Sequence, residues 1–305
     1  MKVLIATEKP FAANAVASIK QEVEQAGHQL VLLEKYTEVE QLYAAVADAD
    51  ALIVRSDKVT AEVLEHAQTL KIIVRAGAGY DSIDCAAAKT KGIIVENTPG
   101  QNANAVAELV LGLLVYAARN FYNGKLGIEL SGKKIGILAF GNVGQNVARI
   151  AKGFGMDIYA FDPYCPANVM QAAGVKPVAS KEELFKTCDI LSLHIPATAE
   201  TKQSINYALL KDLPKGAIVV NTARKEIIHE DELLKVLSER QDVKYVTDIM
   251  PDKAEEFSQF TSQYYSTPKK MGAQTAEANF NAGLAAAKQI NAFFASGDTK
   301  FQVNK

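Results

Sequence analysis

The stretch between Lys133 and Pro163 constrains the fold most, because its hydrophobic pattern changes twice within one short run. A continuous apolar segment, residues 134–140, is typical of a buried strand. A glycine turn follows it, and from Gln145 the apolar side chains recur at helical spacing until further glycines end the helix. A second apolar run, residues 157–161, completes the unit. This order of strand, turn, helix and strand predicts a parallel sheet covered by helices.

The glycine turn has the chemistry of a dinucleotide-binding site. Gly141 and Gly144 let the backbone approach a pyrophosphate closely, while the N–H groups of Asn142 and Val143 open a helix whose dipole attracts an anion. Asp162 ends the second strand, where a carboxylate can accept both ribose hydroxyls of NAD and would repel the extra phosphate of NADP. We therefore expect NAD as the cofactor.

Ala139 departs from the usual pattern of this turn, G-x-G-x-x-G, because it stands where the first glycine is found. That glycine allows a tight turn of the backbone. An alanine can replace it only if its φ stays negative. The motif is therefore weaker than usual, although the flanking strands and the acid are all in register.

Composition indicates a two-domain protein with a small-molecule partner. The chain has 305 residues, is 49% hydrophobic and carries a net charge of -2, which excludes a basic face for nucleic acid or a polybasic membrane anchor. Its longest apolar stretch, residues 105–118, contains Glu108 and is shorter than the roughly 20 residues of a membrane span. Cys85, Cys165 and Cys188 lack the spacing of a metal site, so we expect reduced thiols in a cytoplasm and no metal.

Strand and helix patterns alternate along nearly the whole chain. One alternation covers residues 2–96 and a second covers 133–267, so we expect two doubly wound parallel sheets in an α/β protein. The helical pattern between them, residues 103–119, is apolar on more than one face. We interpret it as a hinge between domains and a contact of a homodimer, with a core helix of the single chain as the alternative.

Several separate stretches resemble the D-2-hydroxyacid dehydrogenases, and they occur in the order found in that family. They cover nearly the whole chain, so together they are far more specific than any one motif. The stretches are residues 70–81, residues 97–102, the glycine turn, His194-Ile195-Pro196 with Thr201, and Asn221-Thr222-Ala223-Arg224.

The resemblance implies two domains with different tasks. Residues 1–98 and 275–305 would form a flavodoxin-like substrate-binding domain, and residues 99–274 would form a Rossmann domain that binds NAD. The chain ends at Lys305, so we expect no C-terminal regulatory domain and no serine feedback through one.

The resemblance also implies a substrate. Residues 53–60 and the turn at 75–77 are similar to family members that oxidise D-3-phosphoglycerate to 3-phosphohydroxypyruvate with NAD, the first step of serine biosynthesis. The expected partner is therefore a small phosphorylated 2-hydroxy acid.

Two basic residues are the expected catalytic groups. Arg224 matches the family's arginine, whose planar guanidinium binds the substrate carboxylate with two parallel hydrogen bonds. The family's proton-transfer histidine is replaced by Lys270, and its partner glutamate by Lys253. A lysine base needs no carboxylate to fix a tautomer, so the two changes are consistent with each other.

Alternatives remain open at this position. Lys269 could take the place of Lys270 as the proton-transfer residue, both lysines could be solvated loop residues, and Glu255 or Glu256 could supply an acid after a shift in register.

The other expected site residues follow from the same resemblance. Substrate contacts are expected from Arg55, Ser56, Arg75, Ala76, Gly77, Ala78, Gly79, Asn102 and Lys269. Cofactor contacts are expected from Gly141, Asn142, Val143, Gly144, Asp162, His194, Ile195, Pro196, Thr222, Ala223, Arg224, Asp248, Gly272 and Ala273.

Two other functions compete with this interpretation. The same fold could serve a glyoxylate or hydroxypyruvate reductase or a D-lactate dehydrogenase. The missing histidine and glutamate also favour, to some extent, a non-catalytic NADH-binding protein similar to the family's transcriptional corepressors.

Overall fold

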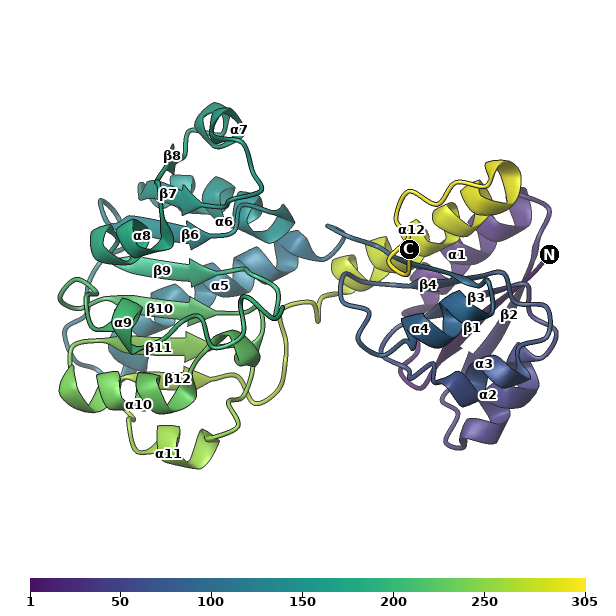
Figure 1. Cartoon of the computed structure of the whole chain (residues 1–305), viewed down its shortest axis with the longest axis horizontal. Coiled ribbons are helices and arrows are strands. Elements are labelled where there is room, and N and C mark those ends of the chain that lie inside the picture. The colour runs from purple at the N-terminus through teal and green to yellow at the C-terminus, as the bar shows by residue number, and fades with distance from the viewer. The chain divides into compact units, whose positions relative to one another are not determined.

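The computed structural model describes all residues, 1–305, and the chain divides into two compact units (Figure 1). The first unit comprises Met1–Asn102 and Gln274–Lys305, and the second comprises Ala103–Ala273. Each unit contains one sheet in which all paired strands are parallel. The predicted α/β class with two parallel sheets is therefore confirmed.

The first unit is built on a five-stranded sheet in the order β2-β1-β3-β4-β5. Its strands are β1 (Lys2–Thr7), β2 (Gln29–Glu34), β3 (Ala51–Val54), β4 (Ile72–Arg75) and β5 (Ile94–Asn97). Its helices are α1 (Ala13–Gln25), α2 (Val39–Val46), α3 (Ala61–His66), α4 (Cys85–Thr90) and α12 (Ala276–Ser296).

Side chains of this sheet alternate between two apolar layers. Leu52 and Val54 of β3 pack with α2, α3 and α4, whereas Ala51 and Ile53 pack with α1 and α12. Both faces are therefore covered, which explains why the strands read as continuous apolar runs in the sequence.

The second unit is built on a seven-stranded sheet in the order β12-β11-β10-β9-β6-β7-β8. Its strands are β6 (Lys134–Leu138), β7 (Asp157–Phe161), β8 (Lys176–Pro177), β9 (Ile190–Leu193), β10 (Ile218–Asn221), β11 (Lys244–Thr247) and β12 (Tyr264–Ser266). Its helices are α5 (Ala103–Ala118), α6 (Asn142–Gly153), α7 (Ala167–Ala172), α8 (Lys181–Thr187), α9 (Tyr207–Leu210), α10 (Glu230–Glu239) and α11 (Ala254–Ser258), with short 3₁₀ turns at Asn120–Tyr122 and Lys225–Ile227.

Helix α5 is a core helix of the second unit. Ala107, Val110, Leu111 and Leu114 pack with α6 and with the strands beneath them. The core packing that we considered as an alternative therefore accounts for these apolar side chains without a second body.

The strand order of the second sheet reverses between β6 and β9. From β6 the chain moves to β7 and β8 on one side, and then returns to β9, β10, β11 and β12 on the other. In open parallel sheets such a switch point leaves a crevice at the carboxyl ends of the strands, where ligands bind.

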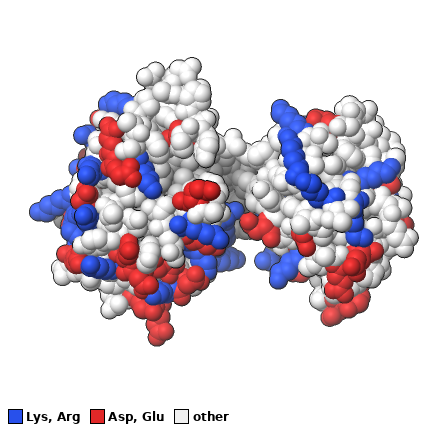
Figure 2. Space-filling view, viewed as in Figure 1, with Lys and Arg blue, Asp and Glu red and all other residues white.

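Two surface properties bear on the kind of partner. No helix combines the length and the apolarity that crossing a bilayer requires. Lys and Arg are interspersed with Asp and Glu on the face of each unit that is visible in Figure 2.

Candidate functional site

The glycine turn lies at the switch point and opens α6. A Cβ atom on Gly144 would lie 2.3 Å from the carbonyl oxygen of Ala139, so only glycine lets the first turn of α6 approach the end of β6. Gly141 is the N-cap and offers no side-chain cap to the first N–H groups of the helix. These donors are therefore open to an anion, as a pyrophosphate site requires.

The negative φ expected at Ala139 is wrong, because its φ is 78°. Its N–H donates to the carbonyl of Phe161 at 2.9 Å, and its own carbonyl points at the start of α6 beside Gly144. The turn thus needs a left-handed residue here, and the alanine adopts that conformation at a cost of about 1–2 kcal/mol. The sheet and α6 hold it in place.

Asp162 connects the end of β7 to the glycine turn. Its Oδ2 accepts a hydrogen bond from the N–H of Phe140, and its Oδ1 accepts one from the N–H of Tyr164, both at 2.8 Å. A carboxylate has about four acceptor positions, so two remain for ribose hydroxyls.

Asn221 shapes the loop that carries Arg224, and sequence reasoning gave it no role. Asn221 is fully buried at the end of β10; its amide donates to the carbonyl of Arg224 at 2.9 Å and accepts from the N–H of Ala223 at 3.0 Å. Nη1 of Arg224 donates to the carbonyl of Ala223 at 2.9 Å. An asparagine at the end of an apolar strand could have indicated this role in the sequence, because its side chain often forms hydrogen bonds with the backbone of the following turn.

Asp248 anchors the loop that carries the two lysines. It is buried after β11, and its carboxylate accepts hydrogen bonds from the Thr267 hydroxyl at 2.8 Å, the Met271 N–H at 2.8 Å and the Gly272 N–H at 2.7 Å. A Cβ atom on Gly272 would lie 3.1 Å from this carboxylate, so the loop approaches closely. Lys269 and Lys270 lie between these anchor points.

Lys253 is held toward helix α10. Its ammonium forms an ion pair with Asp231, which raises the pKa of Lys253. Its backbone N–H donates a hydrogen bond to the carboxylate of Glu230 at 2.8 Å. Glu255 and Glu256 lie in the first turn of α11 and are exposed.

The carboxyl edge of the second sheet therefore collects the predicted cofactor residues and both predicted catalytic residues. Parallel strands bring them together because all their carboxyl ends meet at one edge. They are the glycine turn after β6, Asp162 after β7, His194-Ile195-Pro196 after β9, Thr222-Ala223-Arg224 after β10, Asp248 after β11, and Lys269, Lys270, Gly272 and Ala273 after β12.

The first unit carries the other predicted substrate residues, and Arg55 is among the most constrained of them. Its Nη1 donates to the carbonyls of Lys9 and Pro10 at 2.6 and 3.0 Å, and its Nη2 donates to Asn279 at 2.5 Å. The guanidinium also lies 5.0 Å from the centre of the Phe11 ring. Burial lowers the pKa of Arg55 from its usual value.

Arg75 crosses the backbone of Gly77. Its Nε donates to the carbonyl of Arg55 at 2.8 Å, and a Cβ atom on Gly77 would lie 1.5 Å from its Nη1. Gly77 has a φ of +146°, a conformation that L side chains rarely adopt, so the backbone favours glycine here. The amide of Asn97 donates to the carbonyl of Ala78 at 2.6 Å and fixes the rest of this turn.

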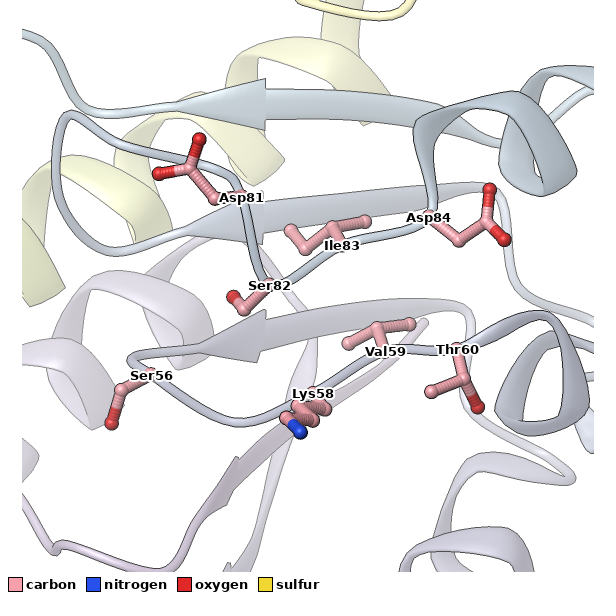
Figure 3. Close-up of a pocket in the computed structure, with 8 residues that line it drawn as sticks. All are labelled: Ser56, Lys58, Val59, Thr60, Asp81, Ser82, Ile83 and Asp84. Atoms are coloured by element: carbon pink, nitrogen blue, oxygen red, sulfur yellow. The ribbon is translucent and has the colours of Figure 1, made fainter. Parts of the chain in front are cut away.

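A hollow of about 510 Å³ lies beside Ser56 (Figure 3). Residues of the loop after β3 and of the loop at 81–84 line it, and a bridge between Val59 and Ile83 joins the two loops. Two of its polar side chains have structural tasks, because Thr60 caps α3 and Asp84 caps α4. Lys58 and two serines supply much of the remaining polar lining.

Comparison with known proteins identifies the family. The family model described as "D-isomer specific 2-hydroxyacid dehydrogenase, NAD binding domain" matches residues 114–268. A D-3-phosphoglycerate dehydrogenase of Methanocaldococcus jannaschii is 39% identical over 82% of this chain and 51% of its own length. A hydroxypyruvate reductase of Thermotoga maritima is 36% identical over 86% of this chain and 90% of its own.

A solved structure covers the whole chain. The NAD⁺-bound 3-phosphoglycerate dehydrogenase of Entamoeba histolytica is 46% identical, with a TM-score of 0.90 over 100% of this chain and 99% of that one. The chain therefore belongs to the D-isomer-specific 2-hydroxyacid dehydrogenase family. It spans about half the length of the Methanocaldococcus relative.

The second unit contains the NAD-binding domain of this family, and its residues fit the cofactor. The close approach at Gly144 leaves the helix N-terminus open, and Asp162 retains acceptor positions. The hydroxyl of Thr222, at the carboxyl end of β10, is buried and has no hydrogen-bond partner within the protein. A polar ligand at this edge would satisfy it.

Proposed function

We propose that this protein oxidises D-3-phosphoglycerate to 3-phosphohydroxypyruvate with NAD. The observation that carries the proposal is the shared carboxyl edge of the second sheet, where the loops of Arg224 and Lys270 follow β10 and β12 on the same edge as the glycine turn. The Entamoeba and Methanocaldococcus relatives, both named for this substrate, support its choice.

Bound NAD⁺ would supply the acceptor for the hydride on C2 of the substrate, and the protein's own residues would hold the substrate and move one proton. Arg224 would bind the carboxylate through two parallel hydrogen bonds and polarise the C2 oxygen. Lys270 would take the proton of the C2 hydroxyl as a general base, and would return it in the reverse direction.

A lysine base is effective only if its pKa is lowered toward the working pH. The positive ring of NAD⁺ and the Arg224 guanidinium are the cations that would lower it for Lys270. Oxidation of the hydroxy acid is therefore expected to accelerate as the pH rises, because more of the lysine is then neutral.

The phosphate of the substrate would bind at the first unit. Arg55 and Arg75 follow neighbouring strands, and Nε of Arg75 donates to the carbonyl of Arg55. Three hydrogen bonds of the Arg55 guanidinium go to protein acceptors, and an arginine has five N–H donors, so two are left for a ligand. Lys58 and Ser56 line the hollow nearby.

Reduction of an unphosphorylated 2-keto acid is the second candidate. The Thermotoga hydroxypyruvate reductase favours it, since the alignment covers 90% of that protein. Rates on D-3-phosphoglycerate and on D-glycerate distinguish the two functions. A preference for the phosphorylated acid that is reduced in Arg55→Ala supports the first, and equal rates on both acids contradict it.

The decisive experiment mixes the protein with NAD⁺ and D-3-phosphoglycerate and follows the absorbance of reduced nicotinamide. An increase in that absorbance would support the proposal that the protein is an enzyme. NADH binding without turnover on any 2-hydroxy acid would instead favour a non-catalytic binding protein.

We further infer a homodimer that works in the cytoplasm. Tyr122, Leu126 and Ile128 are apolar side chains exposed in the segment after α5, with 67%, 96% and 44% of their surface accessible. Exposed apolar groups close together in sequence are typical of a subunit contact. Light scattering of the wild type and of Leu126→Asp tests the dimer, and cell fractionation tests the location.

A further inference from the structure

Ser192 and His194 form a hydrogen-bonded pair at the end of β9. Oγ of Ser192 lies 2.8 Å from Nε2 of His194. Ser192 is fully buried, and its neighbours in register are Ile137 of β6 and Val220 of β10. It is thus a polar side chain within an apolar layer, where a hydroxyl must find a partner inside the protein.

This environment determines which atom carries the proton. Ser192 Oγ has no hydrogen-bond partner other than the imidazole, so its hydrogen can go only to Nε2. A proton on Nε2 would leave the buried O–H without an acceptor, at a cost of about 1–3 kcal/mol. Burial also lowers the pKa of His194 to about 3, so the ring is neutral and its single proton lies on Nδ1.

The protonated atom faces an accessible region. Nδ1 of His28 and of His229 are buried without a partner, whereas Nδ1 of His194 has no partner in the protein and is not buried. The backbone N–H of His194 donates a hydrogen bond at 2.9 Å to the carbonyl of Leu138, the residue directly before Ala139. His194 therefore lies beside the glycine turn, at the switch point between β6 and β9.

We propose that the Ser192 hydroxyl fixes His194 as the neutral Nδ1–H tautomer, and that this N–H donates a hydrogen bond to an oxygen of bound NAD. The proposal rests on NAD binding by the second unit and names a positioning residue for it. A neutral N–H suits this place, because it can donate a hydrogen bond to a phosphate or ribose oxygen without first taking up a proton.

The tautomer is measurable without any substrate or cofactor. In protein labelled with ¹⁵N-histidine, the imidazole nitrogen shifts separate protonated from unprotonated atoms, and the chain has only four histidines. We expect Nδ1 of His194 to be protonated and unchanged between pH 5 and 8, and Ser192→Ala to transfer proton density to Nε2. A proton on Nε2 in the wild type, or no change in Ser192→Ala, would overturn the proposal.

Two substitutions of the histidine test the contact with the cofactor. His194→Asn places an amide N–H near the position of Nδ1, whereas His194→Gln places one near Nε2. NADH fluorescence titrations should show binding within a few-fold of wild type for His194→Asn, and about tenfold weaker binding for His194→Gln and Ser192→Ala. If His194→Gln binds as well as His194→Asn, the assigned donor is wrong.

A separate measurement checks that the variants are folded. Thermal unfolding of each variant shows whether the sheet is intact, and Ser192→Cys replaces Ser192→Ala if the latter does not fold. Cysteine preserves the size of the side chain but donates weakly. We therefore expect Ser192→Cys to reproduce the tautomer change at least in part, and an unchanged tautomer would overturn the proposal.

Discussion

The carbonyl oxygen of Ala139 lies 2.3 Å from the position that a Cβ atom on Gly144 would occupy. The two residues are the ends of one tight turn between β6 and α6, and each fixes the conformation of the other. Ala139 adopts a φ of 78° in this turn, where the family pattern has a glycine. The crevice at which we expect the cofactor to bind therefore depends on a close backbone contact that is made through a strained residue.

Gly144→Ala should abolish NADH binding. The added methyl group would meet backbone rather than a flexible side chain, so α6 must move away from β6 and take its N–H donors with it. Gly153→Ala is the matched control at the other end of the same helix, because nothing lies within 4 Å of its Cβ position. Fluorescence titration should show loss of binding only in the first variant, and retained binding there would contradict the proposed role of the turn.

Ala139→Gly should raise the free energy of unfolding by about 0.5–1 kcal/mol. Glycine adopts the left-handed conformation without the cost of about 1–2 kcal/mol that alanine has there, which stabilises the folded state. Glycine also gives the unfolded chain more conformational freedom, and this offsets part of the stabilisation. Ala17→Gly, at an exposed position inside helix α1, is the control and should destabilise instead. Urea unfolding measures both, and a less stable Ala139→Gly would mean that the turn does not need a positive φ.

Glu96 should make the protein less stable as the pH rises from about 4.5 to about 7. Its carboxyl group is buried on β5, burial and the nearby Asp298 raise its pKa to about 7, and the N–H of Phe301 donates to it at 3.2 Å. The unfolded chain releases this proton at lower pH than the folded protein does, so deprotonation favours unfolding over that interval. Melting temperatures at pH 5 and pH 8 should differ less in Glu96→Gln than in wild type, and an equal difference would exclude Glu96 as the cause.

Local patterns in the sequence predict most of the fold. Strand and helix periodicities mark most strands of both sheets, because burial on two faces gives continuous apolar runs. The two-residue strand β8 (Lys176–Pro177) is too short to show such a pattern. Asp162 and the glycine turn could be placed at one edge for the same reason, since parallel strands end together. These predictions depend only on residues close together in the chain.

Contacts between distant residues could not be predicted. The amide of Asn279 receives a hydrogen bond from Arg55, and the two residues are 224 positions apart. The φ of Ala139 is set by how α6 packs on β6, and no pattern within the turn reveals it.

The central claim is that Lys270 moves the proton in place of the family's histidine. It is tested most directly by single-turnover oxidation of D-3-phosphoglycerate across pH in wild type and Lys270→Ala, with Lys235→Ala on α10 as control and NADH affinity measured in parallel. We predict that the wild-type rate rises toward alkaline pH, that Lys270→Ala lowers it by at least about 100-fold and removes the rise, and that NADH affinity is unchanged. A near-normal rate with the same pH profile in Lys270→Ala would contradict the claim.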